Sequence, residues 1–326
     1  MPITIESTAS DAIDLEELVA ILLQERVNTL DHESMVSAGA TLKRLANNRT
    51  FLADMILNGL KNYPFVEQGA STYGPQVMIL VPPTEPASNF LVRANIWPAA
   101  ADHATRASGP TQFGYYQPHD HCFNFLTVGY SGPGYRSNYY EYDYQKTSGY
   151  PGEPVELSFI EQSCLHEGRV MLYRAFVDVH DQLPPESMSI SINVMEASAR
   201  GLVYDQYSFD VGKQAVAGII NPLPSSALME MLAGLGDDDS HDFLVETAAR
   251  HSKDRVRFAA LKALASAAPS LSASVDLLSR GTRDSSTLIS GWSTAELDRL
   301  EHLEGRALIG DMPPGVYRNI PLTLKQ

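Results

Sequence analysis

The feature that most constrains this chain is a change of hydrophobic period, from a helical repeat to a two-residue repeat and back. Between about residues 72 and 211, apolar and polar residues alternate in short runs such as "NFLVRANIW" and "SMSISINVM". Turns rich in Pro and Gly, such as "VPPTEP" and "SGYPGEP", separate these runs. Many short strands at regular spacing indicate an antiparallel sandwich or barrel rather than a parallel sheet with crossover helices.

Helical patterns flank this β region on both sides. In "DLEELVAILLQERV" the apolar residues recur at helical spacing, and Asp14 with Glu17 forms a capping pattern. The later segments are amphipathic and rich in Ala and Leu, and one of them resembles a single helical pair of a HEAT-type repeat. We therefore expect an α+β protein with a helical segment at 1–65, a β-barrel with the functional site at 66–212 and a helical region at 213–326.

Composition narrows the class of partner and the compartment. The formal net charge of −15 repels phosphate backbones and anionic lipid, so we expect neither nucleic acid nor a membrane as the main partner. No apolar run reaches the length of about 18 residues that a membrane span needs. The first residues lack the basic segment of a signal peptide. The 2 cysteines form no disulfide framework, and we expect a cytoplasmic protein.

The strongest functional pattern is the pair of histidines in "HDHCFNFLTV". If this stretch is extended, alternate side chains point to one face. The residues that then share that face are His119, His121, Phe123, Phe125 and Thr127. An H-x-H pair on a strand is spaced to hold one metal ion, and neutral imidazole suits iron, copper, zinc and nickel. The competing interpretation is two surface imidazoles beside a turn.

A third ligand should come from another strand, and His180 is the candidate. It ends the β-type segment "RVMLYRAFVDVH", just before a proline-rich turn. Two histidines in phase and a third at the end of a later strand favour a metal site over chance. Asp178, two residues before His180, would share its face and could orient its ring.

The region 110–195 resembles a cupin. The usual first cupin motif places a Gly, an H-x-H pair, a Glu and a closing Gly at fixed spacing. Here Gly114 lies one residue closer to His119 than in that motif, and Gly132 stands where the closing glycine belongs. In the second motif Gly168 precedes His180, but "RAF" replaces the usual Pro-x-Gly. The resemblance covers about a third of the chain and implies a double-stranded β-helix, an antiparallel β-barrel, around a metal ion.

The glutamate of the first cupin motif is missing, since Phe125 or Leu126 stands in its place. In one interpretation the metal has three histidines alone, as in thiol dioxygenases of the cysteine dioxygenase type, which the "HDH" stretch also resembles. Those enzymes use ferrous iron with open positions for substrate and oxygen. In the other, Glu141 is a fourth ligand: a hairpin closed by "SGPGYRS" would place it opposite Phe125. Glu141 could equally be solvated on the outer face.

Further residues could orient a substrate. In "NFLVRANIW", Arg93, Asn95 and Trp97 share one face, and an arginine fork there would match a substrate carboxylate. In thiol dioxygenases an arginine on an early strand has this role, although a solvent-facing arginine fits the pattern as well. Tyr116 could supply a hydroxyl. The catalytic tyrosine that follows the third histidine in those enzymes has no counterpart here.

The expected function is a mononuclear non-haem iron cupin dioxygenase that acts with O₂ on a small polar molecule, such as an amino acid or related carboxylate. Zinc, manganese, nickel or copper could replace Fe(2+). The predicted catalytic residues are Arg93, Tyr116 and Glu141, and the predicted metal ligands are His119, His121, His180 and Glu141. The alternatives are a metal-dependent isomerase, lyase or hydrolase, and a non-catalytic small-molecule-binding cupin whose helical C-terminal region binds a protein. The sequence is compatible with a homodimer but does not fix the oligomeric state.

Overall fold

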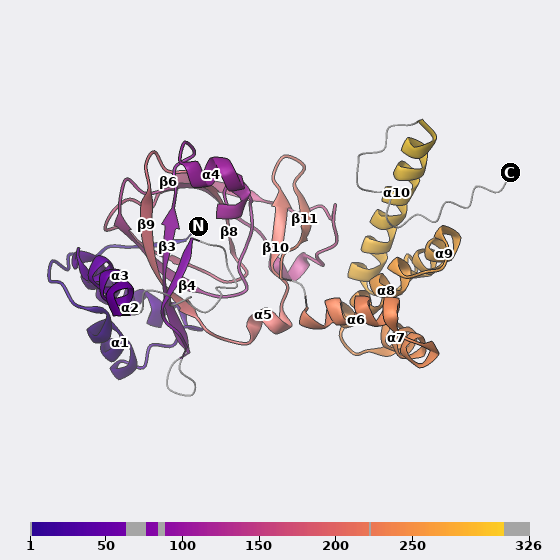
Figure 1. Cartoon of the computed structure of the whole chain (residues 1–326), viewed down its shortest axis with the longest axis horizontal. Coiled ribbons are helices and arrows are strands. Elements are labelled where there is room, and N and C mark those ends of the chain that lie inside the picture. The colour runs from indigo at the N-terminus through magenta and orange to yellow at the C-terminus, as the bar shows by residue number, and fades with distance from the viewer. Residues whose placement is uncertain (1, 63–75, 84–88, 222, 310–326) are drawn as a thin grey trace. The chain divides into compact units, whose positions relative to one another are not determined.

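The structure is a computed structural model that describes residues 2–62, 76–83, 89–221 and 223–309. The chain forms two compact units (Figure 1). The first unit comprises Met1–Tyr144 and Glu156–Val211, and the second comprises Gln145–Val155 and Gly212–Gln326. The boundary predicted at 65/66 lies outside the described residues.

Two antiparallel sheets form the centre of the first unit. The larger sheet has six strands in the order β1-β7-β4-β9-β3-β2, and the smaller has three in the order β6-β5-β8. The strands of the larger sheet are β1 (Ile3–Ile5), β2 (Val77–Val81), β3 (Phe90–Trp97), β4 (Phe125–Ser131), β7 (Val170–Tyr173) and β9 (Ser189–Glu196). Those of the smaller sheet are β5 (Arg136–Glu141), β6 (Ser158–Cys164) and β8 (Asp178–Leu183). The predicted antiparallel β architecture is confirmed.

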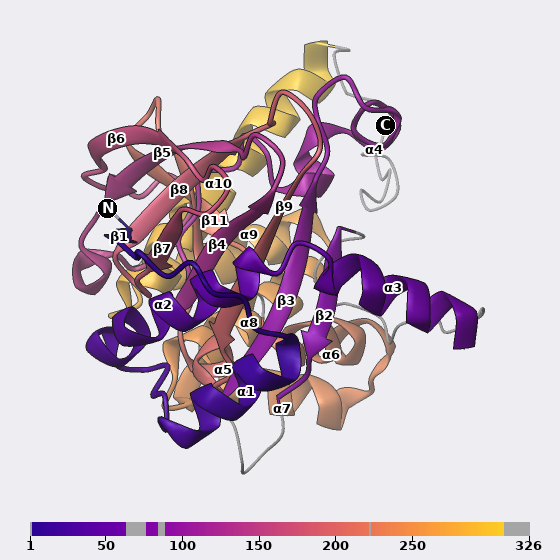
Figure 2. The same cartoon turned by 90° about the vertical axis from the view of Figure 1, so that its left-hand side faces the viewer.

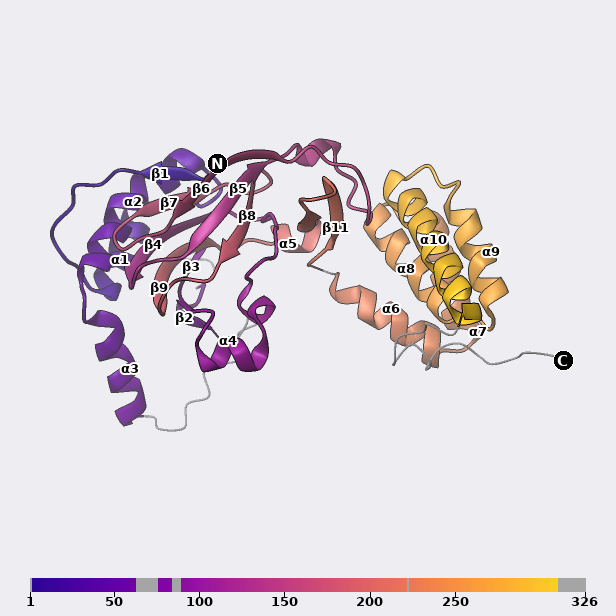
Figure 3. The ribbon, with the colours of Figure 1, turned by 90° about the horizontal axis from the view of Figure 1, so that it is seen from above.

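Helices cover the outer face of the six-stranded sheet. The N-terminal helices are α1 (Leu15–Gln24), α2 (His32–Asn47) and α3 (Phe51–Asn62), and Figures 2 and 3 show α1 and α2 beside the sheet. Asp14 caps α1 as predicted, because its carboxylate accepts a hydrogen bond from the Glu17 amide at 2.7 Å. Fully buried leucines of α1 and α2 pack against outward residues of the strands, among them Leu126 and Val194.

The inner face of the same sheet looks toward the three-stranded sheet. Aromatic side chains of both sheets meet there, including Phe125 and Tyr173 from the larger sheet and Tyr139 from the smaller. Shorter elements complete this unit: α4 (His103–Ser108), η1 (Pro110–Phe113), α5 (Arg200–Val203) and β10 (Tyr207–Asp210). The alternation of faces along each strand thus separates a helix-covered side from an interior side.

Two predicted features of the strands are wrong. "RVMLYRAFVDVH" is not one strand, because it breaks into β7 and β8, which belong to different sheets. The break holds Phe176 with a φ of 64°, a left-handed conformation that no strand continues through. The predicted hairpin of β4 with β5 also does not form: β4 pairs with β7 and β9, whereas β5 pairs with β6 and β8.

The second unit is mainly helical. Its elements are β11 (Ala215–Ile219), α6 (Pro224–Leu235), α7 (Asp238–Arg250), α8 (Asp254–Ser266), α9 (Leu271–Gly281) and α10 (Thr287–Ile309), and η2 (Tyr144–Lys146) lies at the junction of the units. A core of small and branched side chains, including Leu244 and Ala260, joins α6, α7 and α8. Among the described helices, none is both long and apolar enough to cross a membrane.

Candidate metal centre

The two histidines of the H-x-H pair lie just ahead of β4, in an irregular extended stretch. The backbone holds this stretch against β8: the His119 amide donates to the His180 carbonyl at 3.1 Å, and the His180 amide donates back to His119 at 3.0 Å. This reciprocal pair brings His180 beside the H-x-H segment, although His180 follows it by 59 residues. The predicted strand from His121 begins only at Phe125.

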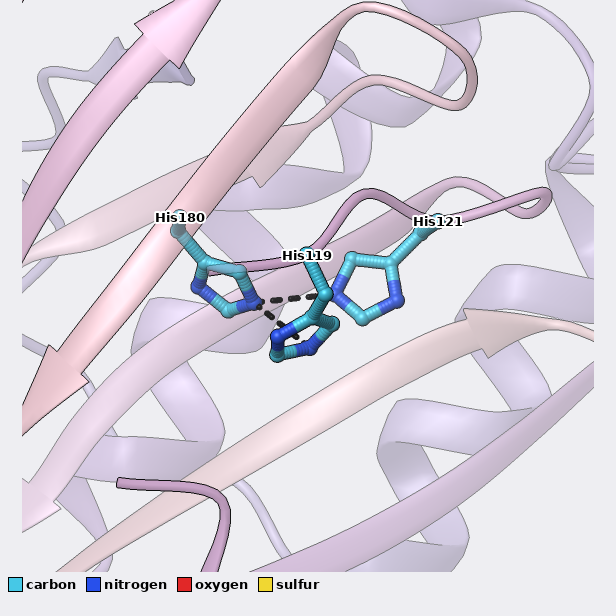
Figure 4. Close-up of side chains that lie close together, drawn as sticks. All are labelled: His119, His121 and His180. Carbon is cyan, nitrogen blue, oxygen red and sulfur yellow. Dashed lines mark hydrogen bonds between the residues drawn. The ribbon is translucent and has the colours of Figure 1, made fainter. Parts of the chain in front are cut away.

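The three imidazoles point toward one another (Figure 4). The Nε2 atoms of His121 and His180 are 3.0 Å apart, and those of His180 and His119 are 3.2 Å apart. One nitrogen from each ring can be chosen so that all three lie within 4.8 Å of one another. His121 and His180 are buried, whereas His119 is half-buried.

This donor set fits a transition metal ion. Ligand nitrogens bound at about 2.1 Å to one ion are separated by roughly 3 Å, close to the observed spacings. A ligand histidine must also be neutral. Burial lowers the pKa of His119, and it lowers the pKa of His121 and His180 further, with additional contributions from the other rings and from the Arg93 charge. The site therefore favours neutral imidazoles, the form that binds iron, zinc, copper or nickel.

Groups behind the rings orient them to different degrees. Nδ1 of His119 donates to the Gln117 carbonyl at 2.6 Å, which leaves its Nε2 free to bind a metal. Nδ1 of His121 lies 3.2 Å from the amide nitrogen of Gln206, which also donates to the Asp120 carbonyl at 2.7 Å. Nδ1 of His180 has no hydrogen-bond partner among the described residues.

Asp120, between the two histidines, serves as an anchor on the opposite side of the chain. Its carboxylate accepts hydrogen bonds from the Tyr142 hydroxyl at 2.5 Å and from the Tyr207 amide at 2.6 Å. Burial raises the pKa of this carboxyl to about 7, although these hydrogen bonds act in the other direction. These contacts fix the backbone from which the two imidazoles project.

Arg93 lies on the inner face of the six-stranded sheet and is 8% exposed. It is buried among interior groups rather than facing solvent, which removes one of the two alternatives considered for it. Its charge lowers the pKa of His121 and His180, and therefore acts on the histidine cluster. The structure thus places a buried guanidinium close enough to the buried imidazoles of His121 and His180 for its charge to act on them.

Glu141 does not lie where the hairpin pairing predicted. It is opposite Asp178 on β8 instead of Phe125 on β4. Its carboxylate accepts a hydrogen bond from Arg174 at 2.6 Å. Among the described residues, the group of side chains that could hold a metal ion contains only the three histidines. Asp178 also binds Arg174, at 2.6 Å, so the role predicted for it behind the His180 ring gains no support.

Tyr116 is 54% exposed and has a φ of 59°, and no contact in the described part of the chain joins its ring to the histidines. Its predicted catalytic role therefore stays a prediction. Two other tyrosines approach the site: the ring of Tyr173 lies 5.0 Å from that of His180, and the hydroxyls of Tyr173 and Tyr139 are 2.7 Å apart. No local motif marks these tyrosines or Gln206, because only the pairing of distant strands brings them to the site.

Comparisons with known proteins give likeness at the level of structure alone. No protein-family model matches the sequence, and no curated protein sequence matches it. A cupin-like protein from Thermotoga maritima is 12% identical and aligns with 42% of this chain and 80% of its own, with a TM-score of 0.23. The DMSP lyase DddQ from Ruegeria pomeroyi is 11% identical over 63% of this chain and 81% of its own, with a TM-score of 0.24.

The 11S globulin procruciferin from Brassica napus is 10% identical over 40% of this chain, which spans 27% of that longer protein, with a TM-score of 0.24. Similarity at this level carries no argument about activity. The two antiparallel sheets and the flanking helices form an α+β fold, as predicted, and the convergent histidines give it a candidate metal centre.

Proposed function

We propose that the first unit is a metal-dependent enzyme in which His119, His121 and His180 hold one divalent transition metal ion. The observation that carries this proposal is the convergence of three Nε2 atoms from two separate segments, with spacings of 3.0 and 3.2 Å. Three neutral ligands leave the full positive charge on the ion, and they leave coordination positions for a substrate.

The preferred activity is oxidation of a small polar molecule with O₂, and the preferred metal is ferrous iron. Ferrous iron, when bound, would supply the capacity to activate O₂. The chain's own groups suit such a reaction: Phe123 and Phe125 lie 4.8 and 5.0 Å from the His121 ring and exclude water from one side. The half-buried His119 leaves an approach for the substrate.

Arg93 is the proposed substrate clamp. A guanidinium on the inner face of the sheet can bind both oxygens of a carboxylate, and burial strengthens that charge-assisted contact. The clamp would hold the acid group at a fixed place relative to the histidines, so that an adjacent carbon lies near the metal position. An amino acid or a related carboxylate fits this arrangement.

A lyase, isomerase or hydrolase that uses the metal as a Lewis acid is the second candidate. The paired hydroxyls of Tyr139 and Tyr173, 2.7 Å apart and fully buried, favour it. Burial raises the pKa of Tyr173 well above its usual value, so this hydroxyl stays protonated and can donate a hydrogen bond. Such chemistry needs no O₂.

Oxygen consumption distinguishes these candidates. Protein reconstituted with Fe(2+), zinc or manganese is mixed with a panel of small carboxylates, and O₂ uptake and product formation are followed together. O₂ uptake that requires both iron and a carboxylate supports the dioxygenase. Product formation without O₂ uptake supports the second candidate. Bound metal with no turnover of any carboxylate supports a small-molecule-binding protein and contradicts the proposed enzyme.

A further inference from the structure

A polar row crosses the inner face of the six-stranded sheet. Thr127 on β4, Asn193 on β9 and Arg93 on β3 are register partners, so their side chains stand side by side across three neighbouring strands. Neighbouring strands lie about 4.8 Å apart, which gives the row a span of roughly 10 Å. Asn95 joins this row, because its amide nitrogen donates to the side-chain oxygen of Asn193 at 3.1 Å.

The row lies one pleat further from the histidines than a layer of apolar side chains. That layer consists of Tyr173, Phe125, Met195 and Leu91, which are register partners across the same strands. Its aromatic members contact the histidine rings, at 5.0 Å for Phe125 with His121. A molecule that extends from the histidines along this face therefore passes an apolar layer first and then reaches the polar row.

Two side-chain oxygens of the polar row have no hydrogen-bond partner among the described residues. They are Oγ1 of Thr127 and Oδ1 of Asn95, and these residues are 0% and 3% exposed. Ser191, a near neighbour, is different, because its hydroxyl accepts a hydrogen bond from Trp97 Nε1 at 2.9 Å. Buried polar atoms in folded proteins nearly always have a partner. A bound polar molecule would supply partners for both oxygens.

We propose that Arg93, Thr127, Asn193 and Asn95 form a subsite for a small carboxylate that carries at least one further hydroxyl or amino group. Arg93 binds the carboxylate, and the second group donates a hydrogen bond to Asn95 or exchanges one with Thr127. The Asn95 oxygen can only accept, so the second group must be a donor. The carboxylate contact rests on the proposed function, whereas recognition of the second group rests on the unpartnered oxygens.

The test uses calorimetric titration of the full chain with butyrate and with butyrates that carry one hydroxyl or one amino group at each carbon in turn. We expect at least one derivative to bind roughly 2- to 10-fold more tightly than butyrate, the gain from one or two net hydrogen bonds. Thr127→Val keeps the shape and removes the hydroxyl, and Asn95→Leu removes the acceptor oxygen. The preference should shrink or vanish in the variant that has lost the atom that binds the second group. Ser191→Ala is the matched control and should keep it.

A second readout does not depend on the ligand. Thr127→Val removes a buried, unpartnered hydroxyl, so the ligand-free protein should melt roughly 2–4 °C higher. Equal binding of all the acids, or a preference that survives in both Thr127→Val and Asn95→Leu, overturns the subsite. If all the acids bind equally and Arg93→Lys weakens the binding of each, the result supports the carboxylate clamp and contradicts only the subsite for the second group. If none binds the wild-type chain, both fall, while metal binding is measured independently.

Discussion

The two faces of the six-stranded sheet are formed by alternate residues of the same strands, and the buried residues on the two faces differ in polarity. On the outer face Leu126 and Val194 are fully buried against helices, in a cluster of apolar side chains. On the inner face their chain neighbours Thr127 and Asn193 are equally buried but polar. Burying Leu126 and Val194 thus stabilises the fold, whereas burying the unpartnered Thr127 hydroxyl costs stability. A polar ligand at the subsite proposed for the inner face would offset that cost.

Leu126→Ala should cause the largest loss of stability and so test the outer half of this comparison. Deleting a fully buried leucine from a packed interface costs about 2–5 kcal/mol of unfolding free energy, measured by urea denaturation. Metal bound per folded molecule should not change. The adjacent Thr127→Val is the control, since it should be neutral or stabilising. Equal destabilisation by both substitutions would abolish the distinction between the faces.

Among substitutions of residues on the inner side, His180→Ala should cause the largest loss of metal affinity. Removing one of three ligands should weaken metal affinity by more than about 100-fold, the upper range for loss of an outer partner. Competition with a chromophoric chelator measures this affinity. His166→Ala is the control, because His166 is exposed and its Nδ1 lies 3.1 Å from the carbonyl oxygen of the neighbouring Glu167. Full metal occupancy in His180→Ala would remove that residue from the site.

Arg93→Lys should have a smaller effect, which weakens carboxylate binding and leaves metal binding unchanged. The substitution keeps the positive charge but loses the two-pronged contact with a carboxylate, worth roughly 1.5–3 kcal/mol. Carboxylate binding should weaken by roughly 10- to 150-fold, with unchanged metal content. Carboxylate affinity that is the same in wild-type, Arg93→Lys and Arg93→Ala proteins would show that this arginine has no part in binding.

Glu141→Gln should have the smallest effect, both on stability and on metal affinity. The Glu141 side chain is 38% exposed and its 2.6 Å contact is with Arg174, so the loss of stability should not exceed about 1 kcal/mol. Metal affinity should stay at the wild-type value in the chelator competition. A drop of about 10-fold or more would restore Glu141 as a ligand, against the contacts seen in the structure.

Local patterns in the sequence were enough to predict the faces but not the partners of strands. The alternation in "NFLVRANIW" placed Arg93 and Asn95 together on one face, because side chains alternate along any strand. The same logic brought His119 and His121 to one side. It could not show that β5 lies in the other sheet, since period alone does not select a pairing partner. The position predicted for Glu141 failed for that reason.

Local sequence patterns also could not predict the break at Phe176 or the contact of Gln206 with His121. "RVMLYRAFVDVH" carries no Gly or Pro where the chain leaves one sheet for the other, so nothing in its pattern marks the left-handed residue. Gln206 reaches His121 across 85 residues of chain. Both features depend on contacts between segments far apart in the chain, which the sequence period does not encode.

The central claim, that the three histidines hold one metal ion, is tested most directly by metal analysis. Protein purified without chelator is analysed by inductively coupled plasma mass spectrometry, alongside His121→Ala prepared in the same way. The account predicts close to one equivalent of a transition metal in the wild-type chain and almost none in a folded His121→Ala variant. A folded wild-type chain with no affinity for iron, zinc, manganese, nickel or copper would contradict it.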